Sequence, residues 1–274
     1  MKTMHRIGLW LSLLLFTACA SGPRIDTGIG TAPPSAFGWN IGAADLLDPE
    51  TASQRLGTYL DELAGYGYAT QIRIIYTPDW GPFILQRWIP VIRSKGYRVL
   101  VILSQDGRPH PGDSDLTRQA SWIREGLPAI SDILDAVQLA NEPDGFSGKT
   151  PAEYTAWHRQ MVQMVRQVVP SVPIIGPDLR LIGKSLEWVK ATGLVSGPDY
   201  DVLSLHVTGN RAESDLQRII DGITAMGATK VWVTEGDWGE AAYLRGKGMP
   251  VERTYVYIWN GHEPESRRPG GPLP

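Results

Sequence analysis

The sequence predicts a single-domain α/β protein in which eight parallel strands close into a (β/α)8 barrel. Short β-rich runs alternate with helical patterns from Phe37 onward, and eight such runs follow one another at intervals of about one βα unit. A barrel of this kind uses roughly 250 residues, and the chain has 274. An open, doubly wound sheet is the competing fold. It would use fewer strands and a glycine-rich phosphate loop after the first strand, and residues 40–44 match such a loop poorly.

Each expected strand is a short run rich in β-branched or aromatic residues. We place the eight strands at 37–41, 71–76, 98–103, 136–140, 174–176, 202–205, 231–233 and 255–259. Helix signals fill the gaps between them in the same order. Asp48 is a good cap for the first helix, the second helix stops at Gly96, and the third begins near Asp115. A capping box formed by Thr150 and Glu153 opens the helix after the fourth strand.

The last connections depart from a regular barrel. Helices are expected around 186–191 and 214–226, but only 240–245 is available for a helix between the seventh and eighth strands. The residues after Asn260 are rich in proline and glycine and cannot form an eighth helix. We therefore expect a barrel with a short seventh helix and a missing eighth helix.

Composition excludes several classes of function. The formal net charge of −3 provides no basic surface, so we expect no nucleic-acid partner. The single cysteine excludes a disulfide framework and a thiolate metal cluster. No group of His and Asp has the spacing of metal ligands, so we expect neither a metal nor another cofactor. Ten tryptophans against four phenylalanines indicate that some indoles lie at a ligand surface.

The first residues have the features of an export signal. Lys2 and Arg6 precede an apolar run of ten residues, which is too short to span a bilayer as a helix. The run ends in Phe-Thr-Ala-Cys at 16–19, which resembles a bacterial lipoprotein cleavage box. The resemblance implies cleavage before Cys19, lipidation of that residue and, because Ala20 follows it, an outer-membrane location. The alternative is an ordinary signal peptide cut nearby, with the cysteine incidental.

These features give a predicted domain layout. Residues 1–18 are the signal peptide, and 19–35, rich in Gly, Pro, Ser and Thr, are a flexible tether between the lipid and the domain. The barrel occupies 36–262, and 263–274 are a disordered tail. The protein is thus expected to be lipid-anchored in the bacterial cell envelope, with its N-terminal lipid in the membrane.

Two glutamates are the main candidates for chemistry, because active sites of such barrels lie at the carboxyl ends of the strands. Glu142 follows the fourth strand in Asn-Glu-Pro, and Glu235 ends the seventh strand in Thr-Glu-Gly. Hydrolysis of a glycosidic bond needs two carboxyl groups, one to protonate the leaving oxygen and one to attack the sugar or activate water. Pro143 favours an extended backbone at Glu142, as in the last residue of a strand.

With these motifs in this order, the chain resembles the clan of retaining (β/α)8 glycoside hydrolases that carry catalytic glutamates on strands four and seven, such as cellulases, β-glucanases and xylosidases. The resemblance covers about residues 36–260. It implies that Glu142 is the acid/base and Glu235 the nucleophile. It also implies that Asn141 binds the sugar 2-hydroxyl and that Arg73 supports the nucleophile. His206 stands at the strand-six position of this pattern.

Three tryptophans are candidates for binding sugar rings. The resemblance implies that Trp259 lines the subsite next to the scissile bond, and Trp39 and Trp238 end or follow strands. The chain departs from the clan after His206, where many members have a tyrosine that hydrogen-bonds the nucleophile. Tyr76 is the candidate replacement.

The sequence therefore predicts a retaining glycoside hydrolase that cleaves a β-linked poly- or oligosaccharide by double displacement, with no cofactor. The alternative is a non-catalytic glycan-binding lipoprotein on a degenerate barrel. The distance between the two carboxyl groups separates the readings, because retaining enzymes hold them about 5–5.5 Å apart.

Overall fold

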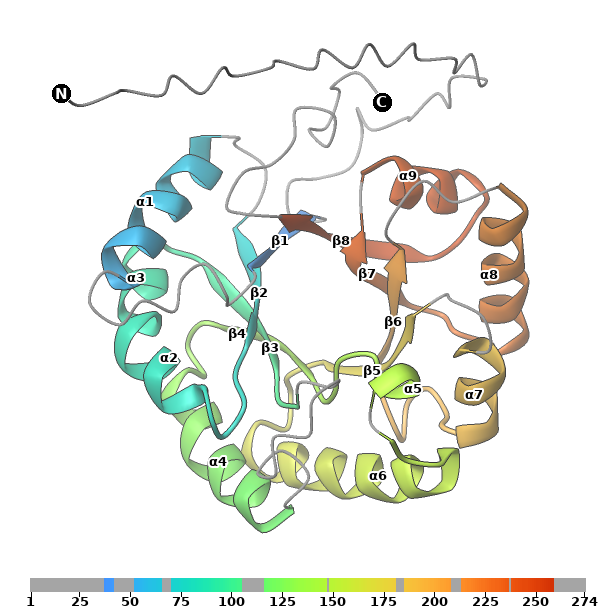
Figure 1. Ribbon diagram of the computed structural model, residues 1–274, viewed down its shortest axis with the longest axis horizontal. Helices are drawn as coiled ribbons and strands as arrows, with labels where there is room; N and C mark the ends of the chain where they lie inside the picture. Colours follow the sequence, from blue (N-terminus) through green and yellow to red (C-terminus); the bar gives the residue numbers. More distant parts are fainter. Residues whose placement is uncertain are drawn as a thin grey trace, which may run out of the picture.

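The structure, a computed structural model, describes residues 37–41, 52–65, 70–104, 116–146, 148–180, 185–207, 213–236 and 238–258. The strands are β1 (Phe37–Ile41), β2 (Gln71–Ile75), β3 (Arg98–Ile102), β4 (Leu134–Gln138), β5 (Ile174–Arg180), β6 (Val202–Val207), β7 (Val231–Gly236) and β8 (Val251–Ile258). They form a closed barrel in chain order, and every neighbouring pair is parallel (Figure 1). The predicted eight-stranded barrel is confirmed.

Helices surround the barrel on its outside (Figure 1). They are α1 (Ala52–Gly65), α2 (Gly81–Arg87), α3 (Ile89–Ser94), α4 (Leu116–Ala129), α5 (Pro143–Phe146), α6 (Pro151–Val168), α7 (Ser185–Thr192), α8 (Glu213–Ala225) and α9 (Trp238–Gly246). Glu153 and Thr150 form the expected capping box, since the Glu153 amide donates to the Thr150 hydroxyl and the Thr150 amide donates to the Glu153 carboxylate. The expected second helix is two helices, because Pro90 at the start of α3 cannot donate to the preceding turn.

The connection between β7 and β8 contains α9, which at nine residues is half as long as α6 with eighteen. This agrees with the expected short seventh helix. The residues expected to lack an eighth helix lie outside the described part of the chain. So do the predicted signal peptide, Cys19 and the tether. No helix within the described ranges combines the length and hydropathy that crossing a bilayer requires.

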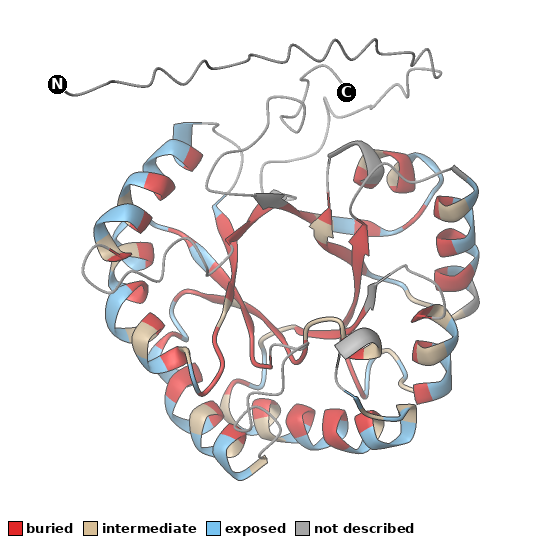
Figure 2. Cartoon of the chain, in the orientation of Figure 1, coloured by how far each residue is buried: buried red, intermediate tan, exposed pale blue. Residues whose placement is uncertain are grey.

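Apolar residues fill two regions, one between the strands and the helices and one inside the barrel. Figure 2 shows the buried faces of the helices turned toward the strands and the exposed faces turned outward. The interior cluster consists of Leu100, Ala136, Ile175, Val202, Trp232 and Tyr255. Successive side chains of a strand alternate between these two regions. The apolar interior therefore forms a packed base for the polar side chains at the carboxyl ends of the strands.

β-Bulges interrupt this alternation, and two of them lie near the carboxyl ends of β5 and β7. Leu205 of β6 pairs with Val233 of β7, but the next residue, His206, pairs with Glu235. β7 thus contains one residue more than β6 at this point. β5 likewise contains one residue more than β6 just before Asp178. A bulge changes which face a side chain points to. Because of these bulges, the side chains at the ends of β5 and β7 reach the interior.

The apolar interior leads to a prediction about Gly38. This residue pairs with Tyr255 of β8, and a Cβ atom at Gly38 would lie 2.5 Å from the buried Tyr255 ring. We expect Gly38→Ala to destabilise the protein by about 1–3 kcal/mol, because the ring must shift in a packed core. Urea unfolding measures the change.

Gly57 of α1 is the matched control. A Cβ atom there meets only a Val91 methyl carbon at 3.6 Å. Gly57→Ala should therefore stabilise the helix by roughly 0.5–1 kcal/mol. Equal unfolding free energies for the two variants would contradict the packing described here.

Candidate functional site

Polar side chains occupy the inside of the barrel at the carboxyl ends of the strands. Seven of these residues are buried: Asn40, Arg73, Gln138, Asp178, Ser204, His206 and Thr234. Buried polar groups are stable only when they are hydrogen-bonded, so their partners define the arrangement. Asn141, Glu142 and Glu235 border the same layer and are partly exposed.

Arg73 of β2 donates hydrogen bonds to residues of β1, β4, β7 and the turn after β4. Its Nη1 donates to Glu235 Oε1 at 2.7 Å and to Asn40 Oδ1 at 3.2 Å. Its Nη2 donates to Asn141 Oδ1 at 2.6 Å, and its Nε donates to Gln138 Oε1 at 2.8 Å. The planar guanidinium therefore fixes the orientation of the Glu235 carboxylate and of the Asn141 amide.

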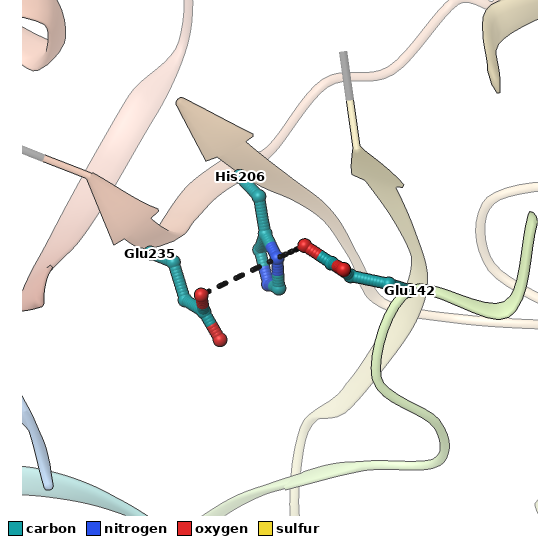
Figure 3. A group of neighbouring side chains, drawn as sticks. All are labelled: Glu142, His206 and Glu235. Atoms are coloured by element: carbon teal, nitrogen blue, oxygen red, sulfur yellow. Dashed lines mark hydrogen bonds and ion pairs between the residues drawn. The ribbon is translucent and has the colours of Figure 1, made fainter. Parts of the chain in front are cut away.

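His206 lies between the two glutamates predicted to be catalytic (Figure 3). Its Nδ1 is 2.8 Å from Glu142 Oε1 and 3.7 Å from Glu235 Oε2. One oxygen of each carboxylate and one nitrogen of the imidazole all lie within 4.8 Å of one another. Each glutamate side chain is 17% exposed. The two carboxylates are thus close together and open to a ligand at the rim of the barrel.

Asp178 of β5 lies beneath this group and is fully buried. Its Oδ2 is 3.3 Å from His206 Nε2 and accepts a hydrogen bond from the Glu142 backbone amide, also at 3.3 Å. The same oxygen accepts from Gln138 Nε2, and Oδ1 accepts from the Thr234 hydroxyl at 3.4 Å. The Asp178 carboxylate therefore contacts His206, the backbone of Glu142, and Thr234, which precedes Glu235.

The backbone of Glu142 differs from the expectation. The sequence predicts an extended residue at the end of β4, but β4 ends at Gln138 and Glu142 has φ = 45°, in the left-handed region. This conformation costs an L-residue roughly 1–2 kcal/mol. The preference imposed by Pro143 is overruled because the chain turns here into α5, and the turned amide bonds to Asp178.

Neighbouring charges shift the pKa values of the buried ionisable groups in the site. Burial alone would raise the pKa of Glu235, but the positive charges of His206 and Arg73 outweigh burial and hold its pKa below the ordinary value. The same balance lowers the pKa of Asp178. Burial alone would lower the pKa of His206, but the charges of Glu235 and Asp178 raise it to about 10. At neutral pH these charges of opposite sign thus favour an imidazolium at His206 and carboxylates at Glu235 and Asp178.

The geometry of Glu142, His206 and Glu235 could in principle suit a metal ion, because each offers a ligand atom. A metal needs an imidazole nitrogen without a proton. Here nearby carboxylates raise the pKa of His206, which disfavours an unprotonated nitrogen, and the Arg73 guanidinium already lies 2.7 Å from Glu235 Oε1. The donor set therefore fits an ion-pair network better than a cation site.

The structure brings together five of the residues predicted from the sequence: Arg73, Asn141, Glu142, His206 and Glu235. Trp259 and the side chain of Trp238 lie outside the described part of the chain. Their predicted contacts with sugar stay predictions.

Two aromatic residues lie elsewhere than expected. Trp39 is completely buried in the outer apolar cluster, because its neighbour Asn40 takes the interior position in β1. It presents no surface to a sugar ring. Tyr76, the candidate replacement for the missing tyrosine, donates its hydroxyl to the Gly126 carbonyl at 3.1 Å and packs against Trp122. It does not contact the nucleophile candidate.

The sequence analysis missed five residues that complete the network: Asn40, Gln138, Asp178, Ser204 and Thr234. A signal was present for all of them, because each is a polar residue at or near the end of an otherwise apolar strand. Buried polar side chains in such positions mark a site or a structural network.

The fold is similar to that of solved glycoside hydrolases. The exo-β-1,4-mannosidase of Opitutaceae bacterium strain TAV5 has a TM-score of 0.60 and 19% identity over 82% of this chain and 51% of that one. This chain therefore spans about half the length of that mannosidase. The GH53 catalytic domain of Ignisphaera aggregans has a TM-score of 0.58 and 14% identity over 84% and 86% of the two chains. The Thermomonospora fusca β-mannanase, solved with mannotriose, has a TM-score of 0.55 and 12% identity over 85% and 80%.

At these identities the likeness establishes the fold and leaves the activity to be argued from the site. No protein-family model matches the sequence. No curated protein matches it either.

The buried network predicts the effect of removing Arg73. Arg73→Met leaves Glu235 and Asp178 without the guanidinium, and breaking a buried pair in this way costs about 3–5 kcal/mol. Arg93→Met is the control, because Arg93 forms a two-bond contact with Asp132 on the surface. The unfolding free energy of this control should fall by about 1 kcal/mol or less. Urea unfolding at pH 7 compares them, and a similar loss in both variants would contradict the role of Arg73.

Proposed function

We propose that this protein is a retaining glycoside hydrolase that acts on a β-linked poly- or oligosaccharide. The observation that carries the proposal is the pair of carboxylates, Glu142 and Glu235, with oxygens within 4.8 Å of each other at the carboxyl end of the barrel. Oxygens this close support direct attack on the sugar, because the carboxyl groups of an inverting pair are about 6.5–9.5 Å apart to admit a water.

The surroundings of the two glutamates support different roles. Glu235 is held ionised by Arg73 and His206, as a nucleophile requires. Glu142 lies at the position where the clan resemblance places the acid/base, and its carboxylate contacts His206 Nδ1 at 2.8 Å. It is the candidate acid. The amide oxygen of Asn141 accepts a hydrogen bond from Arg73. Its amide nitrogen can therefore donate toward a sugar hydroxyl.

The reaction would proceed in two balanced steps. In the first, a Glu235 oxygen bonds to the anomeric carbon, the glycosidic bond breaks, and the leaving oxygen takes the proton of Glu142. In the second, water attacks the same carbon and gives a proton to Glu142, and the bond to Glu235 breaks with its electron pair returning to the carboxylate. Two inversions give net retention of configuration.

The neighbouring structures guide the choice of substrates. They include a mannosidase, mannanases, a β-glucosidase and a cellulase. β-Linked mannans and glucans are therefore the first polysaccharides to screen, followed by xylan and bacterial exopolysaccharides. Binding without turnover across the panel would instead favour the non-catalytic glycan-binding protein.

Once a substrate is found, the two glutamates should behave differently. Glu235→Ala should abolish turnover on every substrate, because no covalent intermediate can form. The turnover of Glu142→Ala on the polysaccharide should fall about 10²–10⁴-fold, because a poor leaving group needs a proton. It should still accumulate the glycosyl-enzyme from an activated aryl glycoside.

Azide then tests the assignment of roles. It needs no base, so with Glu142→Ala it should release a glycosyl azide of retained configuration. With Glu235→Ala it should enter the space of the carboxylate and give the inverted azide. NMR of the anomeric proton distinguishes the products. Glu187→Ala, a change on the exposed face of α7, is the control and should keep wild-type turnover. The same product from both site variants would show that the roles are wrong.

We also propose that a lipid on Cys19 anchors the protein in the bacterial outer membrane. The support is the charged start, the short apolar run and the position of the only cysteine of the chain. Cys19→Ser should move the protein from the detergent phase to the aqueous phase in a detergent-partitioning assay, or leave it unprocessed. Unchanged partitioning would rule out this anchor.

A further inference from the structure

Asp178 has no role in the reaction as described, yet it is the most deeply placed charge of the site. It is fully buried, and the bulge in β5 turns it into the barrel. A buried carboxylate is costly unless its environment compensates it. Its partners include His206, Gln138 and the backbone of Glu142, all of which belong to the catalytic layer.

The contacts of His206 depend on the charge of Asp178. His206 Nε2 lies 3.3 Å from Asp178 Oδ2 and 3.4 Å from Arg73 Nη2. A guanidinium can only donate, and a carboxylate can only accept. A protonated Nε2 therefore bonds to Asp178, whereas an unprotonated Nε2 would accept from Arg73. The negative charge of Asp178 favours the first arrangement.

The other ring nitrogen faces the glutamates. His206 Nδ1 contacts Glu142 Oε1 and Glu235 Oε2. Within the described residues, the charged groups that face the ring come from β2 (Arg73), β5 (Asp178), β7 (Glu235) and the turn after β4 (Glu142). The negative charges of Asp178 and Glu235 thus face the ring against one arginine, which favours a positively charged ring.

We propose that Asp178 is a positioning residue that holds His206 as an imidazolium between the two glutamates, where it stabilises the negative charge that passes from one to the other during turnover. This inference rests on the proposed function. In the first step Glu235 loses its charge as its oxygen bonds to the sugar, and Glu142 gains a charge as its proton leaves. In the second step the charge returns. The imidazolium keeps both protons throughout.

The arrangement also explains how the site functions without the tyrosine that the clan resemblance implies near the nucleophile. The fixed cation lies 3.7 Å from Glu235, and it lies 2.8 Å from Glu142, where charge develops. A preorganised charge at that position favours the transition state without reorganisation. Asp178 acts through neighbours such as His206 and the Glu142 backbone, since it has no exposed surface with which to contact substrate.

The protonation state can be measured without any substrate. In protein labelled with ¹⁵N-histidine, His206 is one of five histidines and is assigned by its loss in His206→Gln. In wild type both ring nitrogens should stay protonated up to about pH 10. In Asp178→Asn the His206 pKa should fall, because one of the two carboxylates that raise it is removed while Glu235 remains. Nε2 should therefore lose its proton at a lower pH than in wild type.

Asp199→Asn is the matched control, because Asp199 is also a buried carboxylate paired with an arginine, Arg159, but does not contact His206. It should leave the His206 titration unchanged. A neutral His206 in wild type at pH 7 would overturn the proposal. So would a titration in Asp178→Asn that matches wild type. If Asp178→Asn does not fold, the wild-type titration still decides the charge, and His206→Gln decides its effect on turnover.

Stability gives a second, independent measurement. A group whose pKa is raised by folding contributes stability that is present below its unfolded pKa and is lost as pH rises through its folded pKa. The wild-type unfolding free energy should therefore fall between about pH 6.5 and pH 10. The unfolding free energy should fall less steeply with pH in Asp178→Asn than in Asp199→Asn. Lysines and tyrosines titrate equally in both variants, so the difference comes from His206.

Kinetics on the substrate found in the screen then test the role in turnover. We expect Asp178→Asn and His206→Gln to lower kcat by about 10²-fold, as removal of one preorganised group does elsewhere. KM should stay unchanged in Asp178→Asn, because the lost stabilisation belongs to the transition state. An Asp178→Asn enzyme with wild-type kcat would overturn the positioning role and leave the proposed hydrolysis intact. Failure to find any substrate would bear on the hydrolysis alone, and the NMR titration would still decide the state of His206.

Discussion

The ion pair between Arg73 and Glu235 joins β2 to β7, two strands that are not neighbours in the barrel. Arg73 is almost completely buried, so its charge must be compensated inside the protein. Glu235 and Asp178 supply the opposite charge, and amide oxygens accept the remaining guanidinium protons. Because the guanidinium is planar and bonded on several sides, the groups around it have little freedom to move. The candidate site therefore depends on this one interaction for its geometry.

This network holds the charged groups at fixed positions before a ligand binds. The pKa shifts favour a cation at His206 beside the Arg73 guanidinium and anions at Glu235 and Asp178, so buried charges of opposite sign face one another. The groups are attached to strands of a closed barrel or to the turn after one. Such elements hold side chains more precisely than long loops do. Both the proposed hydrolysis and the proposed role of Asp178 follow from charges held at fixed positions.

Much of the fold could be predicted from local patterns. All eight strands were placed with overlap, and the capping box at Thr150 was identified, because these features depend on residues close together in the sequence. The motifs around Glu142 and Glu235 were found for the same reason. The prediction that Trp39 contacts sugar was wrong. Its position at the end of a strand indicated the rim, but the alternation of side chains turns it outward, under the helices.

The sequence by itself determined the barrel, the order of its elements and the two glutamates as candidates, because hydrophobic periodicity and helix caps are local. Only the tertiary structure decided which way the key side chains point. Simple alternation with Trp232 and Thr234 would turn Glu235 away from the interior, and the bulge in β7 reverses this. Glu142 reaches the site through a left-handed backbone that Asp178 helps to hold. Bulges and compensated buried charges arise from contacts between strands far apart in the chain, and no local pattern contains them.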